Sequence, residues 1–362
     1  MFLRNIWYFA FQGSDLKPGK MIHKKLLGEP VLFGRKKDGE VFALRDICPH
    51  RGVLLSGGRL LGPGDSAVGE TVSSDQVECP YHGWRFGADG KCAAIPSLVP
   101  GQEIDVEKIR VQRYPVAEKN GLVWVFMPDA EDRPALTDDP ETDIPLPPTL
   151  PGIELDHRPR MRDRIMFDCH IDNAVIGLMD PAHGPFVHQA WWWRTSDSIH
   201  QKAKEFTPSE LGFTMVAHEP SSNSAGYKLL GGKPVTEIAF RLPGIRTELI
   251  TVGKHKVLGL TTVTPIDEDH TEVTQTFFWT NPMFNFLKLI LIPMGRAFLR
   301  QDHRIVMMQK EGLQYNPRLM LINDADVQAK WYYRLKKAWD DAQTSGEAFT
   351  NPVQPATLHW RS

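Results

Sequence analysis

The sequence predicts an α+β protein, in which an all-β amino-terminal domain is followed by a domain whose strands precede its helices. Up to residue 127, short β-rich runs alternate with Asp-Gly turns. Residues 128–152 hold seven prolines and seven acidic residues, a composition typical of an extended connection. Beyond residue 152, alternating runs give way to helical patterns. We therefore expect a first domain at 1–127, a linker at 128–152 and a second domain at 153–362.

The turn residues predict the elements of each domain in order. Two hairpins are expected in the first domain, around Asp38-Gly39 and around Asp89-Gly90, and residues 121–127 form a closing strand. In the second domain we expect a helical stretch near 168–192, strands at 211–218, 235–241, 247–263 and 271–279, and helices near 284–314 and 324–342.

Composition excludes several classes of protein. Lys and Arg number 42 against 44 Asp and Glu, a formal charge of -2, which gives no basic footprint for nucleic acid or anionic lipid. Four cysteines are too few for a disulfide scaffold, and the first residues lack the pattern of a secretory signal. The most apolar segment, 277–299, is interrupted by polar residues and prolines and predicts a buried or interface helix, not a membrane span. We expect a cytoplasmic protein with reduced thiols.

Two short segments predict a metal centre in the first domain. Cys48-Pro49-His50-Arg51-Gly52 and Cys79-Pro80-Tyr81-His82-Gly83 each place a thiol and an imidazole two or three residues apart. Two thiolates can hold one iron of a two-iron cluster while two imidazoles hold the other. Zinc is the alternative, but zinc patterns usually pair Cys with Cys and His with His. The remaining cysteines, Cys92 and Cys169, are expected to be buried free thiols.

A second metal site is predicted from His183, His188 and Asp302. The two histidines are five residues apart, about 140° out of phase on a regular helix, so Gly184 and Pro185 between them must break or bend it. Asp302 lies within an apolar helical stripe, where a bare carboxylate would be costly. Two histidines and one carboxylate form the ligand set of non-haem iron(II) oxygenases. Asp180, three residues before His183, is an alternative carboxylate ligand.

These motifs resemble those of the Rieske non-haem iron oxygenases. The segments CPHRG and CPYHGW resemble the Rieske signature, Asn5-Ile6-Trp7-Tyr8 resembles the entry to the Rieske domain, and 180–183 and 301–306 resemble the second and third motifs of the family. The resemblance implies a Rieske domain followed by a helix-grip (START-like) catalytic domain with an antiparallel sheet. It also implies that Asp180 bridges His183 to His82 of the partner subunit, usually within a homotrimer. The ligands it implies are Cys48, His50, Cys79 and His82 for the [2Fe-2S] cluster and His183, His188 and Asp302 for the mononuclear iron.

The same resemblance implies a terminal oxygenase component. A ferredoxin or reductase would deliver electrons from NADH or NADPH, and dioxygen would hydroxylate or oxidatively demethylate a small aromatic or alicyclic substrate. Length and the 301–306 motif are most similar to the branch with α subunits only, which includes vanillate and dicamba demethylases. A cis-dihydroxylating dioxygenase and an electron-transfer protein without a working mononuclear iron are the alternatives. Trp191-Trp192-Trp193 suits either a subunit interface or a substrate lid.

Overall fold

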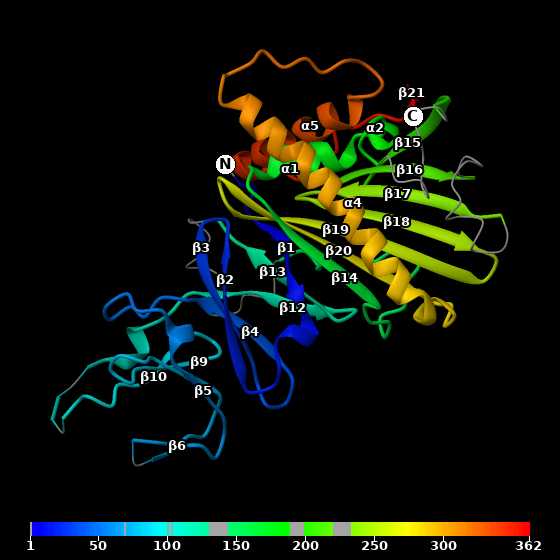
Figure 1. The fold of residues 1–362 in the computed structure, drawn as a ribbon. Coiled ribbons are helices and arrows are strands. Elements are labelled where there is room, and N and C mark those ends of the chain that lie inside the picture. The colour runs from blue at the N-terminus through cyan, green and yellow to red at the C-terminus, as the bar shows by residue number, and fades with distance from the viewer. Residues whose placement is uncertain are drawn as a thin grey trace. The chain divides into compact units, whose positions relative to one another are not determined.

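The structure is a computed structural model that describes residues 2–68, 70–99, 101–102, 104–129, 144–188, 199–219 and 233–362. The chain divides into two compact units, Phe2–Pro148 and Thr149–Ser362. Antiparallel sheets dominate both units (Figure 1).

The first unit consists of small antiparallel sheets. Their strand orders are β11-β4-β3-β2, β10-β9-β8-β5 and β1-β13-β12, with β6 and β7 forming a separate pair. The strands are β1 (Ile6–Gln12), β2 (Lys20–Leu26), β3 (Glu29–Arg35), β4 (Val41–Arg45), β5 (Arg59–Leu61), β6 (Ser66–Ala67), β7 (Glu70–Thr71), β8 (Gln76–Glu78), β9 (Arg85–Gly87), β10 (Cys92–Ala94), β11 (Arg113–Tyr114), β12 (Val116–Lys119) and β13 (Leu122–Met127).

Both predicted hairpins and the closing strand are confirmed. Strands β3 and β4 pair from Arg35 opposite Val41, and β9 pairs with β10. In the second hairpin Gly90 has a φ of +82°, and a Cβ there would lie 2.1 Å from the carbonyl oxygen of Val111, so only glycine fits this turn. Strand β13 is buried along its whole length and pairs with both β1 and β12.

Most of the predicted linker, residues 130–143, lies outside the described residues. Its described part from 144 to 148 belongs to the first unit. There the indole Nε1 of Trp7 donates a hydrogen bond to the carbonyl oxygen of Pro145 over 2.6 Å. This end of the proline-rich segment is therefore tied to β1.

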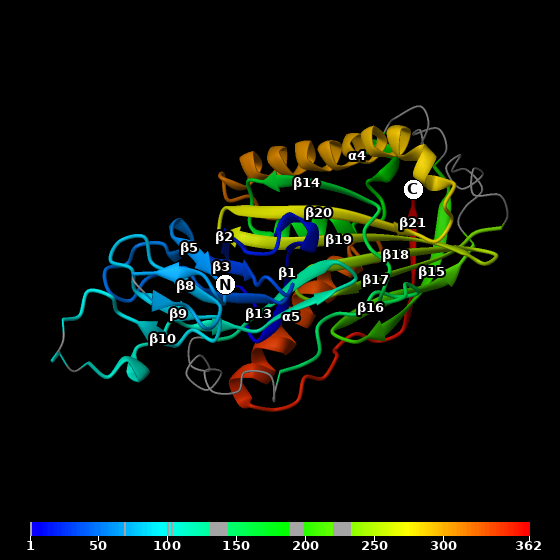
Figure 2. The same ribbon diagram turned by 90° about the horizontal axis from the view of Figure 1, so that it is seen from below.

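The second unit is built on one eight-stranded antiparallel sheet with the order β14-β20-β19-β18-β17-β16-β15-β21 (Figure 2). The strands are β14 (Met161–Phe167), β15 (Gln201–Ser209), β16 (Gly212–His218), β17 (Val235–Arg241), β18 (Ile245–Val252), β19 (His255–Asp267), β20 (His270–Trp279) and β21 (Ala356–Arg361). The helices are α1 (Ile171–Met179), α2 (Gly184–Val187), α4 (Phe284–Leu313) and α5 (Val327–Ser345).

The helices of the second unit pack on its sheet and on one another. Figure 1 shows the long helix α4 crossing the strands, and α4 packs against β14 and against α1. Helix α5 buries Trp331 against Phe206 and Phe213 of the sheet. Burying these aromatic side chains supplies the apolar area that holds the helix layer on the sheet. The predicted α+β class, with an antiparallel sheet in the second domain, is confirmed.

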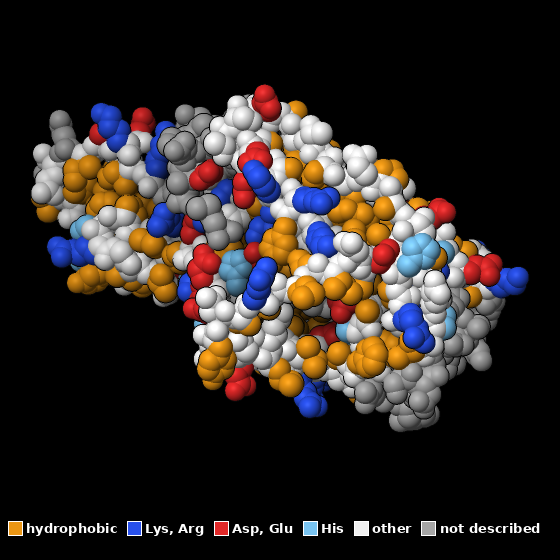
Figure 3. Space-filling view, turned by 90° about the horizontal axis from the view of Figure 1, so that it is seen from above, with side chains coloured by type: hydrophobic (Ala, Val, Ile, Leu, Met, Phe, Trp, Pro, Cys, Tyr) orange, Lys and Arg blue, Asp and Glu red, His pale blue; other side chains and the backbone are white. Residues whose placement is uncertain are grey.

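One expectation about strands is wrong: the run at 247–263 forms two strands, because the chain turns at Gly253, whose φ is +56°. The apolar segment 277–299 completes β20 and then begins α4, where Phe286 and Leu289 are 84% and 86% exposed. Of the two expected forms, a buried helix is therefore excluded, and an interface helix stays a prediction. No helix in the described ranges is both long and apolar enough to cross a membrane. Figure 3 shows one face of the molecule, where hydrophobic side chains are interspersed with charged side chains of both signs.

Candidate metal centres

Two loops of similar geometry carry the four predicted cluster ligands. The amide of Cys48 donates to Val53 O and that of Gly52 to Cys48 O, over 2.8 and 2.9 Å. The second loop repeats both bonds from Cys79 and Gly83, over 2.8 and 3.1 Å. Each glycine has a φ of +71°, which an L side chain adopts only at a cost. The spacing Cys-x-x-x-Gly is therefore what closes each loop.

The loops bring the two thiols together and the two imidazoles together. Cys48 and Cys79 are buried in one apolar cluster, and burial raises the pKa of the Cys48 thiol to about 11, although backbone amides of His50 and Arg51 point at its sulfur. The rings of His50 and His82 lie 4.7 Å apart by their centroids. Burial and the nearby His82 lower the pKa of His50, which favours the neutral form that binds metal. The indole of Trp84 stacks on His50 at 4.6 Å with an interplanar angle of 5°.

The spread of these donors favours a two-iron cluster over a single zinc ion. Four ligands of one tetrahedral zinc lie within about 3.8 Å of one another, given metal-ligand distances of about 2.0–2.3 Å. Within the described ranges, only His183, His188 and Asp302 bring three such donor atoms within 4.8 Å of one another. The two cysteines and two histidines of the first unit do not form so compact a group.

A buried carboxylate that the sequence did not indicate holds the first cluster loop. Asp46, with no exposed surface, accepts hydrogen bonds from the amide and the hydroxyl of Ser56 over 2.7 and 2.5 Å. Its other contact is with Nδ1 of His23 in β2, at 2.6 Å. Asp46 therefore ties both ends of the loop that carries Cys48 and His50 to the sheet.

The second metal site lies where α1 ends and α2 begins. Helix α1 stops at Asp180, its C-cap, because Pro181 follows and disfavours a helical conformation for the residue before it. The helix therefore breaks before His183, and not at Gly184 and Pro185 as predicted. Pro185 instead lies in the first turn of the short helix α2, which begins at Gly184 and whose N-cap and C-cap are His183 and His188. One short turn thus carries both imidazoles to the same side.

Helix α4 brings Asp302 to these histidines. The Nε2 atoms of His183 and His188 lie 3.2 Å apart, and they lie 3.5 and 3.2 Å from Oδ1 of Asp302. The buried face of α4 at this point holds Leu299 and Val306, whereas Ile305 is 44% exposed. Two imidazole nitrogens and one carboxylate oxygen that converge in this way fit the donor set of non-haem iron(II).

Electrostatics also couple these three residues. Burial would lower the pKa of His183, but the hydrogen bond and the charge of Asp302 outweigh it and raise this pKa. Burial would raise the pKa of Asp302, but hydrogen bonds from His183 and His188 outweigh it and lower this pKa. Hydrogen bonds and charges therefore couple the three residues, and a divalent cation would compete with the proton of His183.

Asp180 lies on the far side of His183 from the converging donors. Its Oδ1 accepts a hydrogen bond from the amide of Ala182 over 2.7 Å, and its Oδ2 lies 3.7 Å from Nδ1 of His183. Burial raises the pKa of Asp180. Among the described residues, the buried Nδ1 atom of His183 has no hydrogen-bond partner. This geometry places Asp180 behind His183 and not among the three converging donors.

Other predicted residues are placed as follows. Cys92 and Cys169 are buried free thiols, as expected, and burial raises the pKa of Cys169 to about 11. Trp191, Trp192 and Trp193 lie outside the described residues.

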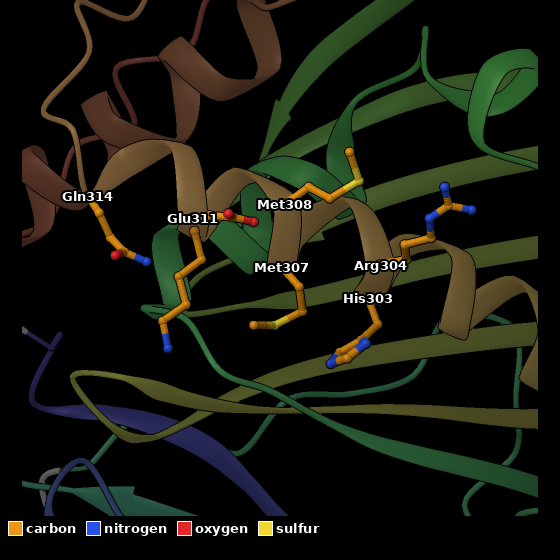
Figure 4. Close-up of a pocket in the computed structure, with 7 residues that line it drawn as sticks. His303, Arg304, Met307, Met308, Glu311 and Gln314 are labelled. Carbon is orange, nitrogen blue, oxygen red and sulfur yellow. The ribbon is translucent and has the colours of Figure 1, made fainter.

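A hollow of about 640 Å³ runs along the end of α4, but none of His183, His188 and Asp302 lines it (Figure 4). Its lining residues are His303, Arg304, Met307, Met308, Lys310, Glu311 and Gln314.

Comparison with known proteins identifies the domain that forms the first unit. The family described as the Rieske [2Fe-2S] domain matches residues 6–115. The chain is 32% identical over 192 residues to the oxygenase component of dicamba O-demethylase from Stenotrophomonas maltophilia, covering 52% of this chain and 48% of that protein. It is 40% identical over 129 residues to the iron-sulfur subunit of the toluene-4-sulfonate monooxygenase system of Comamonas testosteroni, covering 36% and 33%.

Solved structures extend the likeness to nearly the whole chain. Dicamba monooxygenase bound to dicamba superposes with a TM-score of 0.71 at 22% identity, covering 95% of this chain and 99% of that one. NdmA from Pseudomonas putida CBB5, in a mutant with theobromine, gives 0.69 at 18% identity, covering 97% and 95%. The second unit therefore has the fold of these oxygenases.

The first unit therefore matches the Rieske [2Fe-2S] domain over residues 6–115, and the chain shares its fold with dicamba monooxygenase and NdmA. The aligned stretches cover only 25% to 48% of the length of the curated relatives.

Proposed function

We propose that the protein is a terminal oxygenase, which uses electrons and dioxygen to hydroxylate or oxidatively demethylate a small aromatic or alicyclic substrate. The observation that carries the proposal is the convergence of two imidazole Nε2 atoms and one carboxylate oxygen in a chain that also carries a Rieske domain. The proposed ligands are Cys48, His50, Cys79 and His82 for the cluster and His183, His188 and Asp302 for the iron.

When bound, the cluster would supply electrons one at a time, and the iron would supply a site at which dioxygen reacts. The protein's own part is to present the ligands in the correct protonation state. Asp302 would neutralise part of the cation's charge, and three protein ligands would leave coordination positions for further ligands. Oδ2 of Asp180 lies 3.7 Å from Nδ1 of His183, so this carboxylate acts on the imidazole through its charge.

The substrate class follows from the relatives. Dicamba O-demethylase and chloroacetanilide N-alkylformylase are oxygenase components named for removal of a group from oxygen or nitrogen. NdmA, of similar fold, has been solved with theobromine and with caffeine. We therefore favour oxidative O- or N-dealkylation of a small aromatic compound. Demethylation would release formaldehyde, whereas the alternative, cis-dihydroxylation, would place both atoms of labelled dioxygen in the product.

We also propose a ferredoxin or a reductase as the electron donor, with NADH or NADPH as the source, and a homotrimer as the assembly. In that trimer Asp180 would hydrogen-bond His82 of the partner subunit and so connect the two metal centres. Two features support a reducing compartment such as the cytoplasm: all four cysteines are free, and two of them are needed as thiolates.

The test is iron content together with coupled turnover. The purified protein should be red-brown and hold about three irons per chain. His183→Ala should hold about two, keep the visible spectrum of the cluster and form no product from methoxy- or N-methylarenes in the presence of a reductase. His270→Ala, at a side chain that is 48% exposed, is the matched control and should retain three irons and full turnover. Two irons in the wild-type protein would indicate an electron carrier, and a colourless zinc protein would refute both readings.

A further inference from the structure

One side of the His188 ring faces a residue with no assigned role. Nδ1 of His188 lies 3.0 Å from Oε1 of Gln301, while its Nε2 lies 3.2 Å from Oδ1 of Asp302. Phe298 stacks on the ring with centroids 4.1 Å apart and an interplanar angle of 28°. His188 itself is 5% exposed. Helix α4 therefore supplies a carboxylate at one nitrogen, an amide at the other and an aromatic face.

The two contacts compete for the single N–H of a neutral imidazole. If the proton is on Nε2, it can be donated to Asp302, and the lone pair that should bind metal is lost. If the proton is on Nδ1, it can be donated only to Gln301, whose amide oxygen is an acceptor. Without Gln301, Asp302 would favour the tautomer that cannot bind metal.

We propose that Gln301 is a positioning residue that accepts the Nδ1 proton of His188 and thereby holds Nε2 unprotonated toward the metal. The inference rests on the proposed iron site and assigns the partner that prepares one of its ligands. The two histidines differ in this respect, because Nδ1 of His183 has no hydrogen-bond partner and the nearest oxygen of Asp180 is 3.7 Å away. His188 is thus prepared before the metal arrives.

The surroundings of Gln301 explain why an amide is needed at this position. A hollow of about 290 Å³ opens between α2 and α4, and Gln301 lines it together with Phe186, Val187, Arg304 and Ile305. Water in this hollow could reach Nδ1 if the side chain were shortened. The amide therefore occupies the place between solvent and ligand and gives the ring one fixed acceptor in place of mobile water.

The experiment compares metal binding by iron-free wild-type protein, Gln301→Met and Gln301→Glu, with Co²⁺ as the probe. Loss of an outer hydrogen bond to a metal-binding histidine weakens affinity by about 10- to 100-fold. We expect a loss of that size for Gln301→Met, which has similar volume but a poor acceptor. Gln301→Glu restores an oxygen acceptor and should bind Co²⁺ at least as tightly as wild type. Gln309→Met makes the same change on the exposed face of α4 and should change nothing.

A second measurement separates positioning from general damage to the fold. In the Co²⁺ protein the Nδ1 proton of a bound histidine gives a shifted, exchangeable NMR signal. The His188 signal should exchange with solvent slowly in wild type and Gln301→Glu and rapidly in Gln301→Met. Wild-type affinity together with unchanged exchange in Gln301→Met would overturn the inference while leaving the iron site intact. Equal Co²⁺ binding by wild type and His183→Ala would instead overturn the iron site on which the inference rests.

Discussion

Replacing Asp46 with alanine should make the first domain lose its cluster at lower urea than wild type. Alanine would leave the amide and the hydroxyl of Ser56 without an acceptor, whereas His23 is 41% exposed and can bond to water. Ser56 is partly buried, so each donor left without its acceptor costs about 1 kcal/mol, the lower end of the range for a buried donor, and the two cost about 2 kcal/mol. With a urea dependence of about 2 kcal/mol per M, the midpoint falls by about 1 M.

The assay is visible absorption of the cluster along a urea series, with released iron measured at each point. Asp46→Asn keeps an amide oxygen for Ser56 and should lose only about 1 kcal/mol. Asp38→Ala is the control, because the Asp38 carboxylate accepts a hydrogen bond from the exposed amide of Glu40 in the β3–β4 turn. The reasoning is refuted if Asp46→Ala releases its iron at the urea concentration of the wild-type protein.

Three further predictions address the loops and the second site. Asp180→Asn should slow single-turnover oxidation of the reduced cluster at least tenfold and leave both metals bound; a normal rate would contradict the bridging role. Gly83→Ala should destabilise the cluster by about 1–2 kcal/mol, since φ is +71° there, whereas Gly57→Ala, which lacks a positive φ, should be neutral when both are compared by urea midpoint. The metal-free protein should be most stable between the lowered pKa of Asp302 and the raised pKa of His183. Stability should fall at acid pH as Asp302 is protonated and at alkaline pH as His183 loses its proton, and thermal unfolding of His183→Gln should lack the alkaline loss.

The features that the sequence predicted correctly are those with local causes. The two hairpins follow from their Asp-Gly turns, and the pairing of their strands follows from the turn. The break in the predicted helix at 168–192 had a local signal as well, which is the proline after Asp180. The spacing of the histidines predicts a break at Pro185, but the helix ends before Pro181. The fold of β18 and β19 as two strands depends on one glycine in an otherwise continuous β-rich run.

The supporting partners could not be predicted because their contacts are distant in the sequence. Ser56 and His23 lie 10 and 23 residues from Asp46. Gln301 lies 113 residues from His188. In the sequence, only its neighbour Asp302 stands out, as a charge within an apolar stripe. A helical periodicity shows which residues share a face, but it does not show which of them will meet a ligand from another element. That the four ligands of the first unit bind a cluster, and the three of the second an iron, stays a prediction.

The two centres therefore differ in what holds them. Each cluster loop is closed by its own backbone hydrogen bonds and glycine, and Asp46 ties the first loop to the sheet. The second site exists only when α4 packs so that Asp302 and Gln301 face the short turn between His183 and His188. Its precision depends on the buried face of α4, where Leu299 and Val306 fix the rotation of the helix. A change at those apolar positions would alter the second site through helix packing alone. The reason is that one long helix carries Asp302, the acceptor Gln301 and the Phe298 ring stacked on His188.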